Sequence, residues 1–205
     1  MPAAGDGRVV GAVLCGGASR RMGTPKALVE VDGVPMAARV AGAMSQAGAG
    51  RIVLVGGDPA WSTRLHLPLV PDRWPGEGPL GGLATALLDH SGEDGGTGGE
   101  IVLVVACDQP WMDGGSLRLL LGGLAAEPMA VAAVAVGIDG RRAPFPAAWR
   151  SSEAARLRAL VEGGARRAGV AVDGQRHVQV VLPPGVLADV DRPEDLPGGG
   201  PPSGP

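Results

Sequence analysis

The sequence contains no tyrosine, one phenylalanine and four tryptophans, so aromatic residues make up only 2% of its 205 residues. A core built from this chain must therefore take its volume from valine, leucine and alanine. Apolar residues account for 45% of the sequence, which is enough for burial to drive folding. This length and composition favour a single α/β domain in which helices cover a largely parallel sheet.

Long apolar segments and clusters of one charge are also scarce. The most apolar window, residues 129–138, is too short to span a bilayer, and residues 1–7 lack the features of a signal peptide. The net charge is −3, and no basic stripe is interleaved with aromatic residues, so we expect neither nucleic acid nor a membrane as a partner. The two cysteines, Cys15 and Cys107, are too few for a disulfide framework, which favours a cytoplasmic location and small buried roles for both.

Apolar runs alternate with helical patterns along the chain. We predict strands at residues 8–15, 51–55, 67–70, 101–106, 130–136 and 178–182, and helices at 35–47, 81–90, 115–124 and 151–161. The glycine-rich segment 91–100 predicts a mobile surface loop. The alternation predicts βαβ units in one domain spanning residues 8–197, between disordered termini at 1–7 and 198–205. Because ligands of such sheets bind beyond the carboxyl ends of the strands, the segments that follow these ends should converge.

The loop after the first predicted strand, residues 16–26, has the sequence GGASRRMGTPK. Glycines allow the backbone to approach an anion closely, and successive N–H groups can line a phosphate site. In a chain with 36 glycines one glycine pair means little, but Arg20, Arg21 and Lys26 place three cations in this loop. This favours anion binding over a solvated loop, with Lys26 and Arg21 as candidates to stabilise the charge of a transferring phosphoryl group. The Walker A pattern is absent because the chain has no Gly-Lys pair.

Two carboxylates are candidate metal ligands. Asp108 directly follows the apolar run 101–106, where a rigid strand end would aim it at the ligand crevice. Mg²⁺ on a nucleotide typically uses one or two carboxylates together with phosphate oxygens and water. The alternative is an ordinary turn aspartate before Pro110. Asp191 could supply a second ligand or could cap a helix that begins at Pro193.

A third aspartate, Asp72, lies in the Gly/Pro-rich segment 71–82. This segment could close over a base or ribose, or it could be a turn that precedes a helix starting at Pro79. The three histidines lack metal-ligand spacing and are predicted to be surface groups: His66, His90 and His177.

Three motifs together resemble the molybdenum cofactor guanylyltransferase family: LCGGASRRMGTPK at residues 14–26, PDx₅GPLGGL at 71–83 and CDQP at 107–110. The resemblance extends from about Val9 to Leu196. It implies a Rossmann-like nucleotidyltransferase fold, with a mostly parallel sheet and helices on both faces. It also implies Mg²⁺-dependent transfer of GMP from GTP to the terminal phosphate of molybdenum-bearing molybdopterin, with release of pyrophosphate. Transient contact with molybdoenzymes or other proteins of the cofactor pathway would follow from that activity.

The resemblance also implies roles for individual residues. The nucleotide would be contacted by residues of all three motifs: Leu14, Cys15, Gly16, Gly17, Lys26, Asp72 and Asp108. Lys26 would contact its phosphates, and Asp108 would bind both the nucleotide and Mg²⁺. Asp191 falls where the family often has asparagine in an N-x-N-T-P-E motif.

Several positions depart from the family pattern. Cys15 replaces a usual alanine, Gly56-Gly57 follows the second strand where asparagine is often found, and Ala143-Pro144 lacks the histidine of a His-Pro pair. These changes leave the triphosphate motifs intact and leave the acceptor open. A cytidylyltransferase, a transferase for another phosphorylated acceptor and a non-catalytic binding module are the alternatives. The presence of both Lys26 and Asp108 favours an enzyme over a mere binder.

Overall fold

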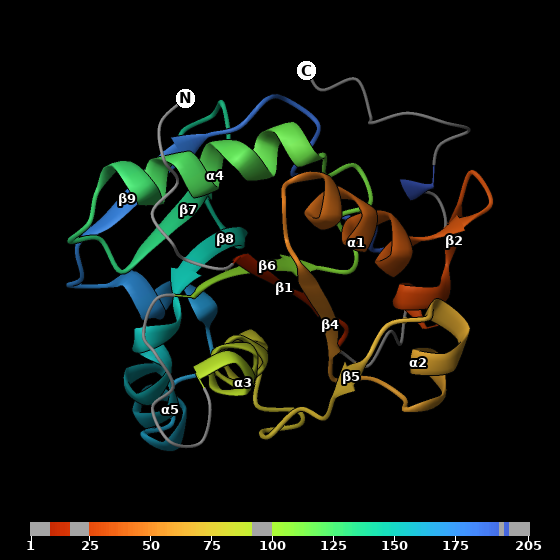
Figure 1. The fold of residues 1–205 in the computed structure, drawn as a ribbon, viewed down its shortest axis with the longest axis horizontal. Helices are drawn as coiled ribbons and strands as arrows, with labels where there is room; N and C mark the ends of the chain where they lie inside the picture. The colour runs from red at the N-terminus through yellow and green to blue at the C-terminus, as the bar shows by residue number, and fades with distance from the viewer. Residues whose placement is uncertain (1–8, 17–24, 92–99, 193–194, 197–205) are drawn as a thin grey trace.

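The structure is a computed structural model that describes residues 9–16, 25–91, 100–192 and 195–196 (Figure 1). The predicted disordered termini lie outside the described residues, as does nearly all of the predicted loop at 91–100. Gly17, Arg20 and Arg21 also lie outside them, so their predicted roles stay predictions.

One seven-stranded sheet forms the centre of the molecule, in the order β5-β4-β1-β6-β8-β7-β9. Its strands are β1 (Val9–Leu14), β4 (Arg51–Val55), β5 (Leu69–Val70), β6 (Ile101–Ala106), β7 (Ala132–Val136), β8 (Arg142–Arg150) and β9 (His177–Val181). Only β8 runs antiparallel to its neighbours, and every other pairing in the sheet is parallel. The predicted mostly parallel α/β fold is therefore confirmed.

Helices cover both faces of this sheet (Figure 1). One face packs against α1 (Met36–Gln46) and α4 (Gly114–Ala126), and the other against α3 (Pro79–Ser91) and α5 (Ala154–Glu162). Apolar side chains recur along α1 at helical spacing, which gives it one buried stripe. The Asp113 side chain caps α4 by accepting a hydrogen bond from the Ser116 N–H at 2.8 Å.

Short elements complete the fold outside the main sheet. A small antiparallel hairpin joins β2 (Glu30–Val31) to β3 (Val34–Pro35), just after the 3₁₀ turn η1 (Lys26–Leu28). Helix α2 (Ala60–Leu65) leads to β5, while η2 (Ser151–Glu153) precedes α5 and η3 (Ala168–Val172) follows it. The predicted helix at 151–161 therefore begins as a 3₁₀ turn.

Strand β8 is the largest element that the sequence did not predict. Its Pro144 and Pro146 argue against a strand, because proline cannot donate a ladder hydrogen bond. The pairing with β6 begins only at Ala147, and the pairing with β7 is irregular between Val134 and Val136. Both prolines therefore lie where the ladder is incomplete.

Histidine placement corrects one further prediction. His90 is buried, with 8% of its surface exposed, although it was predicted to be a surface group. It lies near the end of α3 and its Nδ1 is 3.4 Å from Nη1 of Arg51 on β4. His66 is exposed and His177 is half-buried.

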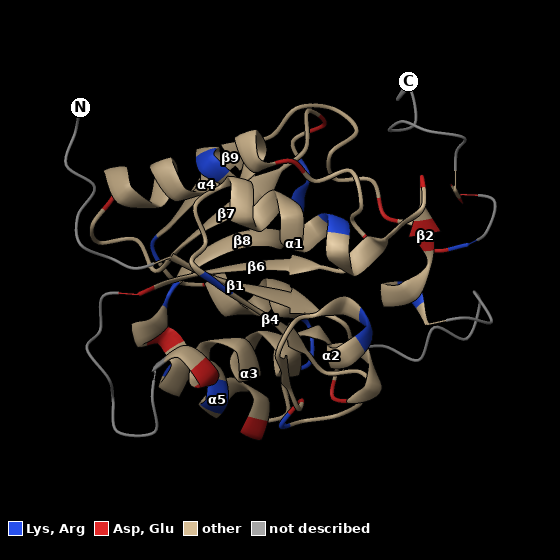
Figure 2. Ribbon diagram, turned by 45° about the vertical axis from the view of Figure 1, so that its right-hand side comes forward, with Lys and Arg blue, Asp and Glu red and all other residues tan. Residues whose placement is uncertain are grey.

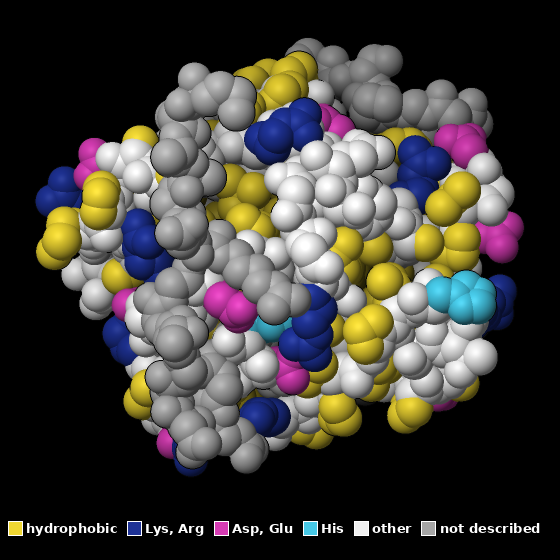
Figure 3. Space-filling model, in the orientation of Figure 1, with side chains coloured by type: hydrophobic (Ala, Val, Ile, Leu, Met, Phe, Trp, Pro, Cys, Tyr) yellow, Lys and Arg dark blue, Asp and Glu magenta, His cyan; other side chains and the backbone are white. Residues whose placement is uncertain are grey.

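Charged residues are scattered around the periphery, and the strands at the centre of the sheet are mostly uncharged (Figure 2). On the face seen in Figure 3, basic and acidic side chains lie close to one another. Within the described ranges, no helix is both long and apolar enough to cross a membrane.

Candidate active site

The carboxyl ends of β1, β4, β5 and β6 meet at one edge of the sheet. Backbone pairing continues one residue beyond the strands there. The Cys15 N–H donates to Val55 O at 2.9 Å, the Gly56 N–H to Val70 O at 2.9 Å, and the Cys107 N–H to Leu14 O at 3.0 Å. The segments that follow these four strands therefore converge, as the parallel topology predicts.

Gly16 and Gly56 lie against each other at this edge. A Cβ on Gly56 would be 3.4 Å from the Gly16 Cα, and a Cβ on Gly16 would be 3.7 Å from Asp72 Oδ2. Gly56 also has a φ of +74°, which favours glycine. Gly56 thus has a packing role, since it lets three strand ends come together.

The Asp72 carboxylate is fixed through one of its oxygens. Asp72 Oδ1 accepts hydrogen bonds from the Trp74 N–H at 3.0 Å and from the Thr85 hydroxyl at 3.2 Å. Its other oxygen is the one that faces Gly16. Helix α3 does begin at Pro79, so Asp72 lies in the turn before a helix and also beside the strand-end glycines.

Thr85 is a supporting residue that the sequence analysis missed. It is fully buried in α3, and its hydroxyl also accepts a hydrogen bond from the Arg73 N–H at 3.1 Å. The available signal was a single threonine in an otherwise apolar helical run.

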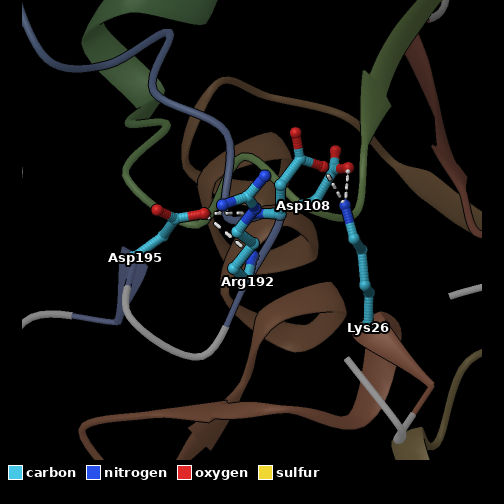
Figure 4. A network of polar contacts seen from close by, with 5 residues as sticks. Lys26, Asp108, Arg192 and Asp195 are labelled. Carbon is cyan, nitrogen blue, oxygen red and sulfur yellow. Dashed lines mark hydrogen bonds and ion pairs between the residues drawn. The ribbon is translucent and has the colours of Figure 1, made fainter. Parts of the chain in front are cut away.

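Lys26 joins two of the predicted site carboxylates. Its Nζ donates to Asp108 Oδ2 at 2.9 Å and to Asp191 Oδ1 at 2.5 Å. In Figure 4 the lysine side chain extends from η1 toward the carboxylate of Asp108. Burial lowers the pKa of Lys26, but its hydrogen bonds to Asp191 and Asp108 outweigh that effect and leave the pKa raised. The side chain is therefore an ammonium ion at neutral pH.

Residues 189–191 are held next to Asp108 by a backbone hydrogen bond. The Val190 side chain is completely buried, and its N–H donates to the Asp108 carbonyl at 2.8 Å. The Asp195 carboxylate accepts hydrogen bonds from the N–H groups of Asp191 (3.0 Å) and Arg192 (2.8 Å). Figure 4 shows Asp195 beside Arg192. These bonds determine where the Asp191 carboxylate lies. The predicted cap on a helix at Pro193 falls outside the described part of the chain.

Asp189 is a third carboxylate in this region, and the sequence analysis missed it. Although the residue as a whole is exposed, burial around its carboxyl group raises its pKa to about 6, and the charge of Asp108 adds to that shift. A hydrogen bond with Gln109 acts in the opposite direction. The available signal was the D-V-D spacing, because the buried valine has an aspartate on each side.

The two cysteines are small buried residues, as predicted. They occupy neighbouring positions at the ends of β1 and β6, and a hydrogen bond with Cys15 raises the pKa of the Cys107 thiol well above its usual value. A thiol in this state is a poor nucleophile. Leu14, just before Cys15, is buried against α3.

The residues at this edge can share one cation. Asp108 and Asp191 both contact the same nitrogen atom, so their oxygens lie within reach of a single positive centre. Among the residues that the structure describes, no group of three or more His, Cys, Asp or Glu side chains could hold a metal by itself. This arrangement suits a metal that takes its remaining ligands from a nucleotide and water.

Comparison with known families now adds to this geometry. The sequence profile of the MobA-like NTP transferase domain matches residues 11–179, which is most of the chain. The chain belongs to this family. The chain is therefore a nucleotidyltransferase.

Curated relatives match nearly the whole chain. A molybdenum cofactor guanylyltransferase from Rhodobacter capsulatus is 36% identical over 192 residues, which is 92% of this chain and 93% of the relative. A probable molybdenum cofactor guanylyltransferase from Opitutus terrae is 30% identical over 191 residues, covering 91% and 92% of the two chains.

Solved structures show the same Rossmann-like fold. Molybdopterin-guanine dinucleotide biosynthesis protein A from Archaeoglobus fulgidus superposes with a TM-score of 0.70 at 23% identity, covering 91% of this chain and 94% of that one. A CMP:2-keto-3-deoxy-manno-octonic acid synthetase complexed with CTP superposes with a TM-score of 0.68 at 16% identity, covering 92% and 95%. At these identities the likeness concerns the fold alone.

Proposed function

We propose that this nucleotidyltransferase transfers GMP from GTP to the terminal phosphate of a molybdopterin that carries molybdenum, releasing pyrophosphate. Two observations support the acceptor and the base: the names of the curated relatives and the three motifs that the chain shares with that family. A cytoplasmic location and transient contact with molybdoenzymes or other proteins of the cofactor pathway belong to the same proposal.

The observation that carries the proposal is the Lys26 ammonium between Asp108 and Asp191. Its partner Asp108 follows β6 at the edge of the sheet where α/β folds bind ligands, and Gly16 and Asp72 follow β1 and β5 at the same edge. An ammonium and a carboxylate pair supply the two kinds of group that a nucleoside triphosphate with Mg²⁺ requires. Arginine or lysine contacts phosphate, and carboxylates contact the metal.

Asp108 and Asp191 would hold Mg²⁺, and Lys26 would contact the phosphates of GTP. Bound Mg²⁺ would neutralise phosphate oxygens and help to align the two reactants. Asp72 Oδ2 and the backbone at Gly16 would orient the nucleotide. Because binding in one crevice makes the reaction effectively unimolecular, orientation alone can supply a large part of the acceleration.

The proposed reaction is a direct transfer and requires no protein nucleophile. An oxygen of the acceptor's terminal phosphate attacks the α-phosphorus of GTP, and the bond between that phosphorus and the bridging oxygen to the β-phosphate breaks. Pyrophosphate leaves with the bonding electron pair. Lys26, and Arg21 from the loop outside the described residues, would stabilise the negative charge that accumulates on the leaving group.

A pocket lined in part by β8 is the candidate site for the acceptor. It has a volume of about 440 Å³ and is lined in part by Arg142, Ala143, Pro144, Trp149 and Arg167. Gln109, the residue after Asp108, connects the two regions because its Nε2 donates to the Phe145 carbonyl at 3.1 Å. Asp173 also lines the pocket and accepts a hydrogen bond from Arg142 at 3.4 Å. Two arginines in a pocket whose other lining residues are mostly apolar suit a phosphorylated heterocycle.

The test is a reaction of the full chain with GTP, Mg²⁺ and molybdenum-bearing molybdopterin. We expect one pyrophosphate per product, and a product mass equal to the acceptor plus GMP. Parallel reactions with CTP, UTP and ATP, with thermal-shift measurements for each, determine base preference, since a ligand that binds only the folded state raises Tm. Preferential use of CTP would replace the guanylyl assignment, and binding without pyrophosphate release would favour the non-catalytic module.

A further inference from the structure

Arg39 on α1 connects the two segments that carry Asp108 and Lys26. Its Nε donates to the Pro110 carbonyl at 3.2 Å, two residues after Asp108. Its Nη1 donates to the Val31 carbonyl at 3.2 Å, in the hairpin that follows the Lys26 turn. The guanidinium carbon is also 5.7 Å from the centre of the Trp111 ring. One side chain therefore contacts the backbone of both segments.

A small apolar cluster lies at the same place, separate from the two main cores. We call it the satellite core: Val31, Met36, Trp111 and Val190. Each member comes from a different segment. Val31 follows Lys26, Trp111 follows Asp108, Val190 precedes Asp191, and Met36 begins the helix that carries Arg39. The satellite core thus packs together the three segments whose polar residues meet at the Lys26 ammonium.

Lys26 and Asp191 need such support because neither lies on a strand of the main sheet. Lys26 belongs to a three-residue turn, and Asp191 lies near the end of the described chain. The hydrogen bonds of the sheet reach Cys107, next to Asp108, but they do not extend to the other two residues. Their positions relative to Asp108 depend on the satellite core and on the hydrogen bonds that surround it.

We propose that Arg39 is a positioning residue for nucleotidyl transfer, which holds the hairpin that follows Lys26 and the loop that carries Asp108 at a fixed separation. The inference rests on the proposed function of the Lys26–Asp108–Asp191 site. Arg39 does not contact the reacting groups. It acts by donating from one rigid, planar group to two carbonyls, and the shorter, single-point ammonium of lysine cannot reproduce this geometry.

The kinetic test compares Arg39→Ala and Arg39→Lys with the unmodified protein. Since a displacement of about 1 Å can cost about 100-fold in rate, we expect Arg39→Ala to lower kcat by about 10- to 100-fold. The KM for GTP should rise by a smaller factor, because the displaced Lys26 is only one of the proposed nucleotide contacts and Gly16 and Asp72 are unaffected. Arg39→Lys should recover only a small part of the lost kcat. Its kcat can still be measured if the alanine variant folds poorly.

Arg150 offers a matched control. Its side chain is also half-buried and also donates to backbone carbonyls, those of Ala130 (2.8 Å), Leu124 (3.2 Å) and Glu127 (3.3 Å). It lies at the opposite edge of the sheet, paired with Ile101 at the start of β6. Arg150→Ala should lower thermal stability as Arg39→Ala does and leave kcat essentially unchanged.

A second readout does not depend on turnover, because Lys26 is the only lysine in the sequence. Amine-directed labelling at fixed pH, followed by peptide mass spectrometry, therefore reports on this side chain separately from the N-terminal amine. We expect Lys26 to be labelled several-fold faster in Arg39→Ala than in the unmodified protein or in Arg150→Ala.

The two readouts separate the possible failures. Faster labelling with no GTP-dependent activity in any variant would keep Arg39 as an organiser of the site and overturn the proposed function. Unchanged labelling together with an unchanged kcat would overturn the positioning role itself. Equal losses of kcat in Arg39→Ala and Arg150→Ala would show a general effect of stability, which also contradicts the inference.

Discussion

The candidate site has two halves that the fold supports in different ways. Gly16, Asp72 and Asp108 each lie two residues beyond a strand of the main sheet. The hydrogen bonds of the neighbouring Cys15 and Cys107 and the buried Thr85 hold them there. Lys26 and Asp191 lie outside that sheet, and the satellite core and a few polar contacts fix them. The first half is built on the part of the molecule with the largest core. The second half depends on four buried residues, so its geometry should be easier to disturb.

Because the two halves are supported differently, substitutions in them should affect activity in different ways. Substitutions in the sheet-borne half should abolish activity only when they remove a reacting group. Substitutions in the other half should lower activity even when they remove only packing. The four predictions below test that contrast.

The largest effect should come from Asp108→Ala. Loss of a preorganised electrostatic group typically costs about 100- to 1,000-fold in kcat, and we expect a loss of at least that size. Cys107→Ala is the matched control, because it alters the preceding buried residue and keeps the carboxylate. Steady-state pyrophosphate release measures both variants, and near-normal turnover in Asp108→Ala would refute the mechanism.

Lys26→Met should have two opposite effects. Turnover should fall by about 100-fold because the phosphates lose a cationic partner. The affinity for Mn²⁺ or Mg²⁺ without nucleotide should rise several-fold, since the ammonium no longer competes for Asp108 and Asp191. Calorimetric titration measures the metal affinity.

Lys26→Arg is the control for charge, and its metal affinity should stay low. If Lys26→Met binds the metal no better than the unmodified protein does, the two carboxylates do not form the metal site.

Packing in the two halves can be compared with a pair of valines. Val190 in the satellite core and Val102 on β6 are both completely buried. Truncating either to alanine should lower the free energy of unfolding by about 2 kcal/mol. Only Val190→Ala should also lower kcat, because only Val190 supports the segment that holds Asp191. Equal kcat values in the two variants, measured below their melting temperatures, would contradict the view that the two halves of the site depend differently on packing.

The smallest expected effect is the pH dependence of Asp189. Its pKa of about 6 in the folded protein lies above the ordinary value of 3.8, so folding favours the protonated form. The stability that this group contributes is present below pH 3.8 and is lost as the pH rises through about 6.

Asp189→Asn should therefore unfold at a higher temperature than the unmodified protein at pH 8 without metal, and the gain should vanish near pH 3.8. Because the residue is exposed and solvent screens its charge, we expect about 1 kcal/mol at most. Glu162→Gln, which removes an exposed carboxylate on α5, is the control for loss of a negative charge elsewhere in the chain. A gain that is the same at both pH values would contradict the pKa assignment.

Much of the fold could be predicted because buried parallel strands are continuous apolar runs. Residues 51–55 and 101–106 form β4 and β6 with the predicted bounds. Strand β8 could not be predicted, because its two prolines are tolerated only where the pairing is incomplete, and that depends on its neighbours.

The candidate site shows the same division. The meeting of Asp72 and Asp108 at one edge follows from parallel topology, so the strand pattern was sufficient to predict it. The contact between Lys26 and Asp191 spans 165 positions of sequence and lies outside the ladder, so no local pattern reports it. Thr85, Asp189 and Arg39 were missed for a related reason. Each acts through a partner whose position only the fold determines.

Labelling of the single lysine with and without Mg–GTP tests the central claim most directly. If the Lys26 ammonium and the Asp108 and Asp191 carboxylates form one triphosphate site, saturating Mg–GTP should protect Lys26 from an amine-directed reagent. The Asp108→Ala variant should lose that protection. Lys26 labelling that is the same with and without Mg–GTP, under conditions where the nucleotide raises the Tm, would place the nucleotide elsewhere and contradict the account.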